Sequence, residues 1–234
     1  MKNADFFNKE SSAYSIKRYV EKPISYTQFF FAKRLSVTLK MIGNFVGGKK
    51  ELSLLDIGCA DGIVVNEIYV KFPNTFASLV GIDTAPEMIN TASKKYSSRP
   101  FVFQTRENFS DISKKNVIIE TGVVNYADLS EELEYANSRL EKDGIYIVSL
   151  AGTDSLLNRA KKEDNGYRNF LSYAKYEKEI KNKFEIIRAV PVGLFLPFVW
   201  KLPTLARLLQ PLEIIFRPIS PNLFHEKVYL LRKK

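Results

Sequence analysis

Apolar and polar residues follow one another along the chain in a pattern that predicts strands and helices in turn. From Tyr26 to Val46 apolar residues recur at helical spacing and stop at Gly47-Gly48, which predicts an amphipathic helix. The pattern then predicts short strands at 53–57, 77–82, 101–104, 116–120, 144–150, 184–190 and 226–231. Helices are predicted at 62–72, from Pro86 onward and at 130–141, with Ser130 as N-cap of the last. This alternation predicts an α/β fold with a parallel, doubly wound sheet.

The chain of 234 residues predicts a single domain, 1–234, because strands and helices alternate without a linker or a repeat. The stretch 191–222 is too long for a plain turn and is rich in large apolar residues. Its prolines at 191, 197, 203 and 211 would divide it into short helices, as in a cover that moves. We therefore predict a lid-like insertion at 191–222.

A glycine-rich turn joins the first strand to the helix that follows it. Residues 54–62 are Leu-Leu-Asp-Ile-Gly-Cys-Ala-Asp-Gly, and Asp83 closes the second strand, Leu79-Val-Gly-Ile-Asp. Glycines let the chain turn sharply and bring backbone N–H groups close to a ligand. A carboxylate at the end of the second strand accepts hydrogen bonds from ribose hydroxyls. Together these parts predict a nucleotide-binding βαβ unit.

The spacing within the turn indicates which nucleotide is bound. A dinucleotide site has Gly-x-Gly-x-x-Gly, whereas this chain has Gly58-x-Ala60-x-Gly62. Asp56 precedes the first glycine by two positions, and its negative charge suits a cationic ligand better than a pyrophosphate. With residues 80–89, Val-Gly-Ile-Asp-Thr-Ala-Pro-Glu-Met-Ile, the turn resembles the class I S-adenosylmethionine-dependent methyltransferases, although Ala60 replaces the usual middle glycine.

The resemblance implies S-adenosylmethionine as cofactor and a Rossmann-like seven-stranded sheet in the order 3-2-1-4-5-7-6, with strand 7 antiparallel. It also implies that the N-terminal helical cap, 1–50, and the lid cover the active site at the carboxyl ends of the strands. The residues it assigns to the cofactor are Asp56, Gly58, Ala60, Gly62, Asp83, Thr84, Glu107 and Asn108. The last two are candidates for the adenine, since Arg106 stands where the family often has an acidic residue.

Three residues are candidates for catalysis, because a hydroxyl or ammonium acceptor must lose a proton. His225 is the only histidine, and it precedes the last predicted strand, on the active-site side. Asn125 and Tyr126 follow the fourth strand, near the position where small-molecule members of the family commonly carry a histidine. A structural role for His225 and simple packing of Tyr126 remain alternatives.

The net charge of +9 is concentrated in the last third of the chain, where 151–234 hold sixteen Lys and Arg against eight Asp and Glu. This bias suits an anionic substrate or an anionic membrane surface, with Trp200, Arg207 and Arg217 near the membrane interface. No stretch approaches the roughly 18 apolar residues of a spanning helix, and no apolar signal core begins the chain. A cytoplasmic protein with peripheral membrane contact is expected. One histidine and one cysteine predict no metal site.

The leading hypothesis is transfer of a methyl group from S-adenosylmethionine to a small-molecule or lipid-linked acceptor, anionic or amphipathic in character. The first alternative is a nucleic-acid methyltransferase, which the basic charge would suit. An amino-methylating signature such as Asn/Asp-Pro-Pro-Tyr/Phe would then follow the fourth strand, where the chain has Glu120-Thr-Gly-Val. No nucleic-acid partner is therefore expected. The second alternative is a non-catalytic scaffold that binds the cofactor.

Overall fold

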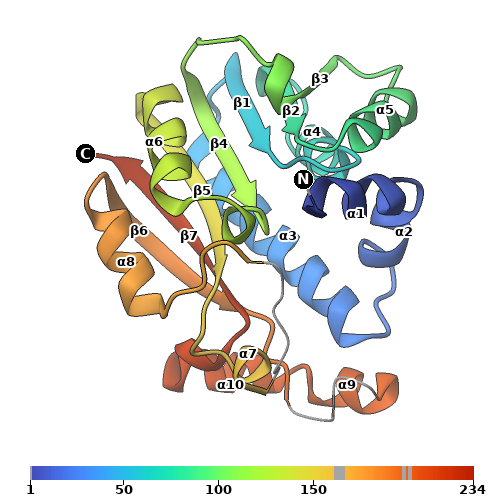
Figure 1. Ribbon diagram of the computed structural model, residues 1–234, viewed down its shortest axis with the longest axis vertical. Helices are drawn as coiled ribbons and strands as arrows, with labels where there is room; N and C mark the ends of the chain where they lie inside the picture. Colours follow the sequence, from blue (N-terminus) through green and yellow to red (C-terminus); the bar gives the residue numbers. More distant parts are fainter. Residues whose placement is uncertain (1, 161–166, 197–198, 200–201) are drawn as a thin grey trace.

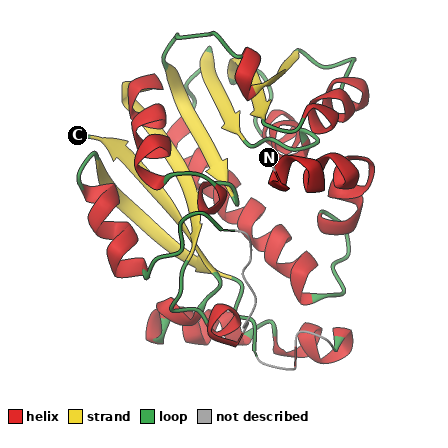
Figure 2. Ribbon diagram, viewed as in Figure 1, coloured by secondary structure: helices red, strands yellow, loops and turns green. Residues whose placement is uncertain are grey.

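Seven strands form one mixed sheet in the order β3-β2-β1-β4-β5-β7-β6 (Figures 1 and 2). The computed structural model describes residues 2–160, 167–196, 199 and 202–234. The strands are β1 (Leu52–Ile57), β2 (Phe76–Asp83), β3 (Phe101–Thr105), β4 (Lys115–Thr121), β5 (Leu140–Ala151), β6 (Phe184–Val192) and β7 (Glu226–Lys233). β7 runs antiparallel to β5 and β6, and the other neighbours are parallel. The predicted strand order and the direction of the seventh strand are confirmed.

Helices cover both faces of the sheet, so its inner strands are apolar on both sides, whereas the edge strands β3 and β6 are partly exposed. Leu54 of β1 packs in the cluster that includes α3 (Tyr26–Val46) and α4 (Ile63–Lys71). Leu55, the next residue, packs on the opposite face in the cluster that includes α6 (Leu129–Arg139) and α8 (Tyr173–Lys181). Both leucines are fully buried. This three-layer arrangement explains the nearly continuous apolar runs of the strands.

The ends of the long helix α3 are set by local chemistry. Ser25 caps its first turn by accepting a hydrogen bond from the backbone N–H of Gln28, in a capping box. Gly47 ends it in the left-handed conformation, with φ 42°. The predicted helix from Tyr26 to Val46 is confirmed.

The prediction that Ser130 is the N-cap of the helix expected at 130–141 is wrong. α6 begins at Leu129, and its N-cap is Asp128, whose side chain accepts a hydrogen bond from the N–H of Glu131. Leu129 is buried against the sheet, so the helix has to begin before Ser130.

The remaining helices lie around the sheet, mostly near the carboxyl ends of its strands. They are α1 (Lys2–Glu10), α2 (Tyr14–Arg18), α5 (Pro86–Lys95), α7 (Leu156–Ala160), α9 (Pro203–Leu209) and α10 (Leu212–Ile219). In Figure 1, α1 and α2 lie beside the ends of β1 and β2, and α9 and α10 run along the lower edge. Trp200, which was expected near a membrane interface, lies outside the described residues. In the described part of the chain, no helix is both long and apolar enough to cross a bilayer.

Candidate active site

A cavity of about 760 Å³ opens at the carboxyl edge of the sheet. Its walls come from the turns after β1, β2 and β4, from the N-terminal helices and from the start of β7. The predicted site residues that line it are Gly58, Ala60, Asp83, Thr84, Asn125, Tyr126 and His225. The structure therefore brings four of the eight predicted cofactor residues and all three predicted catalytic residues to one cavity. Asp56, Gly62, Glu107 and Asn108 lie outside this lining.

The turn after β1 is held open by left-handed backbone. Gly58 has φ 73° and Gly62 has φ 78°, and a Cβ on Gly58 would lie 2.1 Å from Cγ2 of Val123. Ala60 also adopts positive φ, 49°, at the position where the family usually has glycine. Its N–H donates to Oδ2 of Asp83 at 2.9 Å, which holds this strained residue in place.

Asp83 connects the turn to the start of α5. Its Oδ1 accepts a hydrogen bond from the N–H of Ala85 at 2.9 Å, while Oδ2 accepts the one from Ala60. Burial raises the pKa of this carboxyl, and the backbone hydrogen bonds oppose the rise. A carboxylate oxygen accepts more than one hydrogen bond, so Asp83 retains capacity for ribose hydroxyls in the cavity.

Asp56 is a buried carboxylate beneath the same turn. Its side chain is 2% exposed, and its Oδ2 has no hydrogen-bond partner in the described part of the chain. Burial raises the pKa of this carboxyl to about 8, and the nearby Asp83 adds to the rise. A buried carboxylate without a partner is costly unless a cation pairs with it. Arg34 opposes the rise of the Asp56 pKa from inside the protein, while Asp83 lines the cavity, where a ribose would reach it.

The N-terminal helices are attached to the glycine-rich turn through Asp61. Oδ2 of Asp61 accepts hydrogen bonds from Nζ of Lys95 at 2.9 Å and from the N–H of Ser15 at 3.3 Å. Phe7 packs with the turn and reaches Tyr126 across the cavity, with ring centres 6.0 Å apart. The cap thus covers the turn and contacts the far wall.

Two groups of aromatic side chains line another part of the cavity. The rings of Phe30, Phe195 and His225 lie in mutual contact, with centres 5.4 to 5.8 Å apart. Tyr126 and Tyr167 contact each other edge to face at 5.1 Å. The part of the cavity lined by these five side chains is named the aromatic half.

A buried ion pair, which the sequence did not reveal, also lines the cavity. Nη1 of Arg34 on α3 lies 3.2 Å from Oε2 of Glu226 on β7, and both residues line the cavity. Arg34 is 4% exposed and lies on the inward face of α3, one helical turn from Phe30. A charge at that position of an apolar stripe was the signal that could have identified it.

The loop after β3 presents Arg106 to the cavity. Residues Arg106–Asn108 form a short 3-10 turn, η2, in which Glu107 and Asn108 are exposed. Nη1 of Arg106 pairs with Oε1 of the buried Glu132 at 2.8 Å. The carboxylate nearest this end of the cavity therefore comes from α6.

Asn125 and Tyr126 differ in how their side chains are used. The amide nitrogen of Asn125 donates to the carbonyl of Ala151 and to the hydroxyl of Tyr176, and its amide oxygen accepts from the N–H of Ala151. Both ends of this amide are therefore engaged within the protein. Burial raises the pKa of Tyr126, so its hydroxyl stays protonated at neutral pH and acts as a donor.

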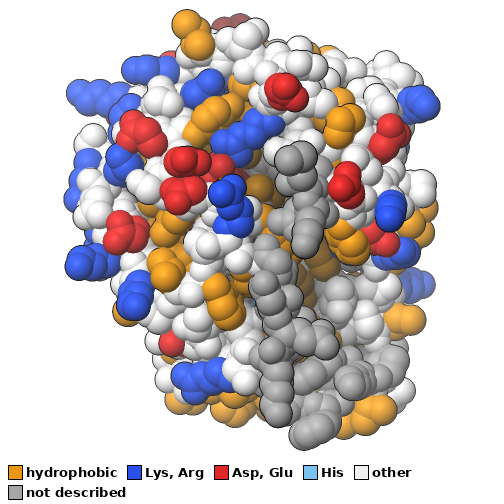
Figure 3. Space-filling view, in the orientation of Figure 1, with side chains coloured by type: hydrophobic (Ala, Val, Ile, Leu, Met, Phe, Trp, Pro, Cys, Tyr) orange, Lys and Arg blue, Asp and Glu red, His pale blue; other side chains and the backbone are white. Residues whose placement is uncertain are grey.

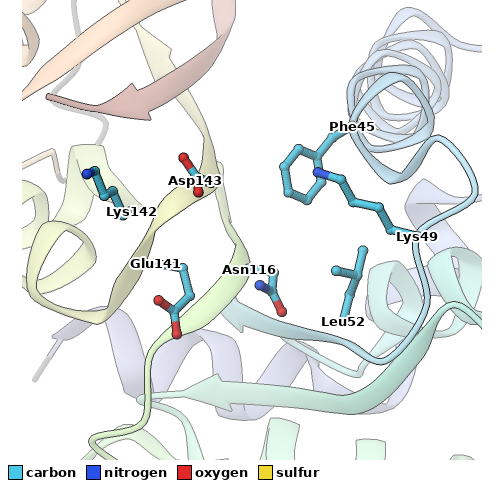
Figure 4. Close-up of a pocket in the computed structure, with 7 residues that line it drawn as sticks. All are labelled: Phe45, Lys49, Leu52, Asn116, Glu141, Lys142 and Asp143. Atoms are coloured by element: carbon cyan, nitrogen blue, oxygen red, sulfur yellow. The ribbon is translucent and has the colours of Figure 1, made fainter.

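A second pocket, of about 230 Å³, lies at the opposite edge of the sheet, where β1, β4 and β5 begin (Figure 4). Its charged residues are Lys49, Glu141, Lys142 and Asp143. None of the predicted site residues lies there. Within residues 2–160, 167–196, 199 and 202–234, no three His, Cys, Asp or Glu side chains come together as a metal site.

The chain is similar in sequence to curated proteins that are named as methyltransferases. A malonyl-[acyl-carrier protein] O-methyltransferase of Ilyobacter polytropus is 24% identical over 63% of this chain and 61% of its own. The ubiquinone/menaquinone biosynthesis C-methyltransferase UbiE of Campylobacter jejuni is 29% identical over 43% of this chain and 45% of its own. The matches thus span less than two thirds of these curated relatives.

Solved structures share the whole fold. Magnesium protoporphyrin IX methyltransferase of Synechocystis PCC 6803, with bound S-adenosylhomocysteine, has a TM-score of 0.67 and 14% identity, and the match covers 99% of this chain and 98% of that one. A family model described as a methyltransferase domain matches residues 48–188, which is more than half of the chain. The chain therefore belongs to the class I S-adenosylmethionine-dependent methyltransferases, whose cofactor is S-adenosylmethionine.

Proposed function

We propose that this protein transfers the methyl group of S-adenosylmethionine to a small-molecule or lipid-linked acceptor bound in the aromatic half of the cavity. The observation that carries the proposal is that Asp83, at the end of β2, lines the cavity and accepts a hydrogen bond from the N–H of Ala60 in the glycine-rich turn, beneath which the carboxyl of Asp56 is buried with one oxygen unpartnered in the described part of the chain. When bound, the cofactor supplies an activated methyl group on a sulfonium. The protein's own task is then to position the acceptor and exclude water.

Each cofactor residue has a proposed role that follows from its place. Asp56 pairs with the positive charge of the methionine half, and Asp83, with Thr84 beside it, binds the ribose. Gly58, Ala60 and Gly62 shape the turn around the ligand. Glu107 and Asn108 remain candidates for the adenine only if η2 rearranges, because both side chains are exposed. Glu132, held by Arg106 at the cavity wall, is the better placed carboxylate.

His225 is the proposed acceptor of the proton. Its ring lies in the cavity against Phe30 and Phe195, and its backbone N–H donates to the carbonyl of Gly193 at 2.8 Å. This support holds the imidazole at one place in the wall. Tyr126 is proposed to donate a hydrogen bond to the acceptor, and Asn125 to hold the wall that carries it.

The proposed acceptor is amphipathic, and the segment 191–222 is its proposed lid. The cavity lining holds four arginines against five carboxylates, so the excess basic charge of the chain lies outside the cavity. Because the excess basic charge lies outside the cavity, it is available on the outer surface of the protein, where it would attract anionic lipid. We propose peripheral contact with an anionic membrane through α9 and α10, where hydrophobic side chains gather along the lower edge of the molecule in Figure 3.

The function is tested with labelled S-adenosylmethionine and fractionated metabolites, lipids and RNA from the source cells. Label is expected in a metabolite or lipid fraction. Label in RNA would instead support the nucleic-acid alternative. Cofactor binding with no transfer to any fraction would contradict catalysis and favour a scaffold.

Binding of the cofactor has its own variant and control. Asp83→Ala is expected to weaken S-adenosylhomocysteine binding by about 1.5–3 kcal/mol, the range for hydrogen bonds to a charged group. Asp143→Ala removes a carboxylate at the opposite edge of the sheet and should leave affinity unchanged (Figure 4). Isothermal calorimetry measures both. Equal affinity of the Asp83 variant and the native protein would refute the assigned site.

The role of His225 predicts a separation of kinetic effects. His225→Ala should lower kcat by about 10²–10⁴-fold, the usual contribution of a positioned base, while cofactor affinity stays nearly the same. In His225→Gln the ring is replaced by a side chain that still forms hydrogen bonds but cannot take the proton. Recovery of kcat in that variant would show that the imidazole does not act as a base.

A further inference from the structure

We propose that the Arg34–Glu226 pair binds the polar head of the methyl acceptor and selects a head that is uncharged and presents a hydrogen-bond donor beside an acceptor, as a carboxamide does. This inference rests on the proposed function, because it takes the aromatic half of the cavity as the acceptor's site. It assigns a specificity-determining role to two residues that stand outside the sequence motifs.

The pair is enclosed and faces the cavity. Nη1 of Arg34 donates to Oε1 of Glu226 at 3.3 Å and to Oε2 at 3.2 Å, and the two side chains are 5% and 7% exposed. The guanidinium carbon lies 4.7 Å from the ring centre of Phe31 and 5.2 Å from that of Phe30. An ion pair walled by aromatic rings is screened little by water.

The pair is fixed at the middle of the sheet edge. Oε2 of Glu226 also accepts a hydrogen bond from the hydroxyl of Ser149 at 2.8 Å, and that hydroxyl accepts one from the N–H of Gly122 at 2.9 Å. A Cβ on Gly122 would lie 2.5 Å from Nη1 of Arg34, so glycine is needed for this approach. The chain of contacts places the pair at the ends of β4 and β5, in the lining of the cavity.

Charge balance decides what such a pair can bind. A carboxylate head would be attracted by Arg34 but repelled by Glu226. An ammonium head would be attracted by Glu226 but repelled by Arg34. Either ion leaves one charge of the site uncompensated, which is costly in a buried place. A neutral head with a donor and an acceptor side by side keeps the pair intact. Arg34 has further N–H groups and Glu226 has further lone pairs for these two hydrogen bonds.

The rest of the acceptor follows from the surrounding side chains. The rings of Phe30, Phe195 and His225 lie in mutual contact in the same cavity, and Phe30 also contacts the guanidinium of Arg34. A planar unsaturated or aromatic body stacks on such rings or meets their edges. The inferred acceptor class is therefore a neutral, dipolar head on a flat apolar body. The sequence led to the expectation of an anionic or an amphipathic acceptor. A neutral head on an apolar body agrees with the amphipathic acceptor and not with the anionic one.

Three probes of the same shape and different charge test the inference. Benzamide, benzoate and benzamidinium share one ring and a planar head, and they carry no charge, one negative charge and one positive charge. Each is titrated into the full chain saturated with S-adenosylhomocysteine, with binding followed by calorimetry or ligand-detected NMR. Benzamide is expected to bind roughly tenfold more tightly than either ion, because only the neutral head leaves the buried charges compensated.

Single charge-removing variants should invert this order. Glu226→Gln leaves the guanidinium unpaired, so benzoate should become the tightest probe. Arg34→Gln leaves the carboxylate unpaired, so benzamidinium should become the tightest. Arg168→Gln removes an exposed arginine of the same cavity lining and should keep the native order. A purely structural ion pair would weaken all probes together and would not exchange their order.

The outcomes separate this inference from the proposed function. Failure of the native protein to bind S-adenosylhomocysteine contradicts the function itself. Cofactor binding with an ion preferred over benzamide, or with no probe bound at millimolar concentration, overturns the neutral-head inference alone. The same order in both charge variants also overturns it. If a variant fails to fold, as judged by thermal denaturation, the ranking of the three probes on the native protein decides.

Discussion

Asp56 is the residue whose protonation depends most directly on the cofactor. With its pKa raised to about 8 by burial and by Asp83, it is mostly protonated at pH 7 in the ligand-free protein. A bound cation would stabilise the carboxylate and lower this pKa, so binding should release a proton. The residue thus links cofactor affinity to pH.

Proton release is measured by calorimetry in buffers of different ionisation enthalpy. At pH 7, S-adenosylmethionine binding is expected to release about one proton, and the release should vanish at about pH 9 and above, where Asp56 is already ionised. Asp56→Asn should abolish it, whereas Asp143→Asn should not. Undiminished release in the Asp56 variant would assign the proton to another group.

The same pKa has a consequence for stability. The folded-state pKa lies above the ordinary value of 3.8, so the folded protein holds more protons than the unfolded chain between about pH 4 and 8. The contribution of Asp56 to the free energy of unfolding is therefore present below pH 4 and is lost as the pH rises through 8. In the ligand-free protein, Asp56→Asn should flatten this part of the pH profile.

The sequence predicted site residues that lie in local motifs, but not side-chain pairs that form between distant parts of the chain. Asp56 and Asp83 were predicted for the cofactor because each stands at a fixed spacing from the glycines of one βαβ unit, and of the two Asp83 lines the cavity. Arg34 and Glu226 are separated by 192 positions, and their meeting depends on α3 crossing the sheet beside β7. Arg106 was recognised as a departure from the family, but its pairing with Glu132 required the position of α6.

At the scale of elements, strands and long helices were predicted more fully than helix ends and short helices. The inner strands bury both faces and were predicted from their apolar runs. The edge strands β3 and β6 are partly exposed, and short runs of apolar and β-branched residues predicted them too. α6 began before Ser130 because packing of Leu129 outweighed the choice among polar caps. In 191–222, the described helices α9 and α10 begin at Pro203 and directly after Pro211. Periodicity in so short a helix as α10 could not indicate which side faces the protein.

α10 presents an inverted arrangement of polar and apolar residues. Glu213 is 5% exposed and accepts a hydrogen bond from the N–H of Leu194 at 3.1 Å, which attaches the helix to the end of β6. Ile214, Ile215 and Ile219 are 70%, 56% and 70% exposed. A helix that buries its carboxylate and exposes three isoleucines gains little from packing on its own fold. This element therefore favours an apolar partner outside the chain.

For the whole molecule, the exposed isoleucines of α10 and the surplus basic charge both favour binding to an anionic membrane. Leu202 and Leu208, 54% and 70% exposed, extend the apolar surface of α10 toward α9. Sixteen basic residues against eight acidic ones in 151–234 add attraction to anionic lipid. Because the same segment connects β6 to β7 at the cavity, membrane contact would place the aromatic half close to an amphipathic acceptor.

Vesicle flotation tests this orientation of the molecule. The protein should float with phosphatidylglycerol-containing vesicles at low salt, and less so as salt screens the attraction. Ile214→Ser with Ile219→Ser should weaken binding by at least about tenfold, since each buried isoleucine contributes about 1.5–3 kcal/mol. Ile112→Ser, an isoleucine 85% exposed in the loop between β3 and β4, is the matched control and should bind as the native protein does. Failure to float at low salt would leave α10 as part of a lid over a water-soluble acceptor, and equal loss in all three substitutions would show that the contact is not through this helix.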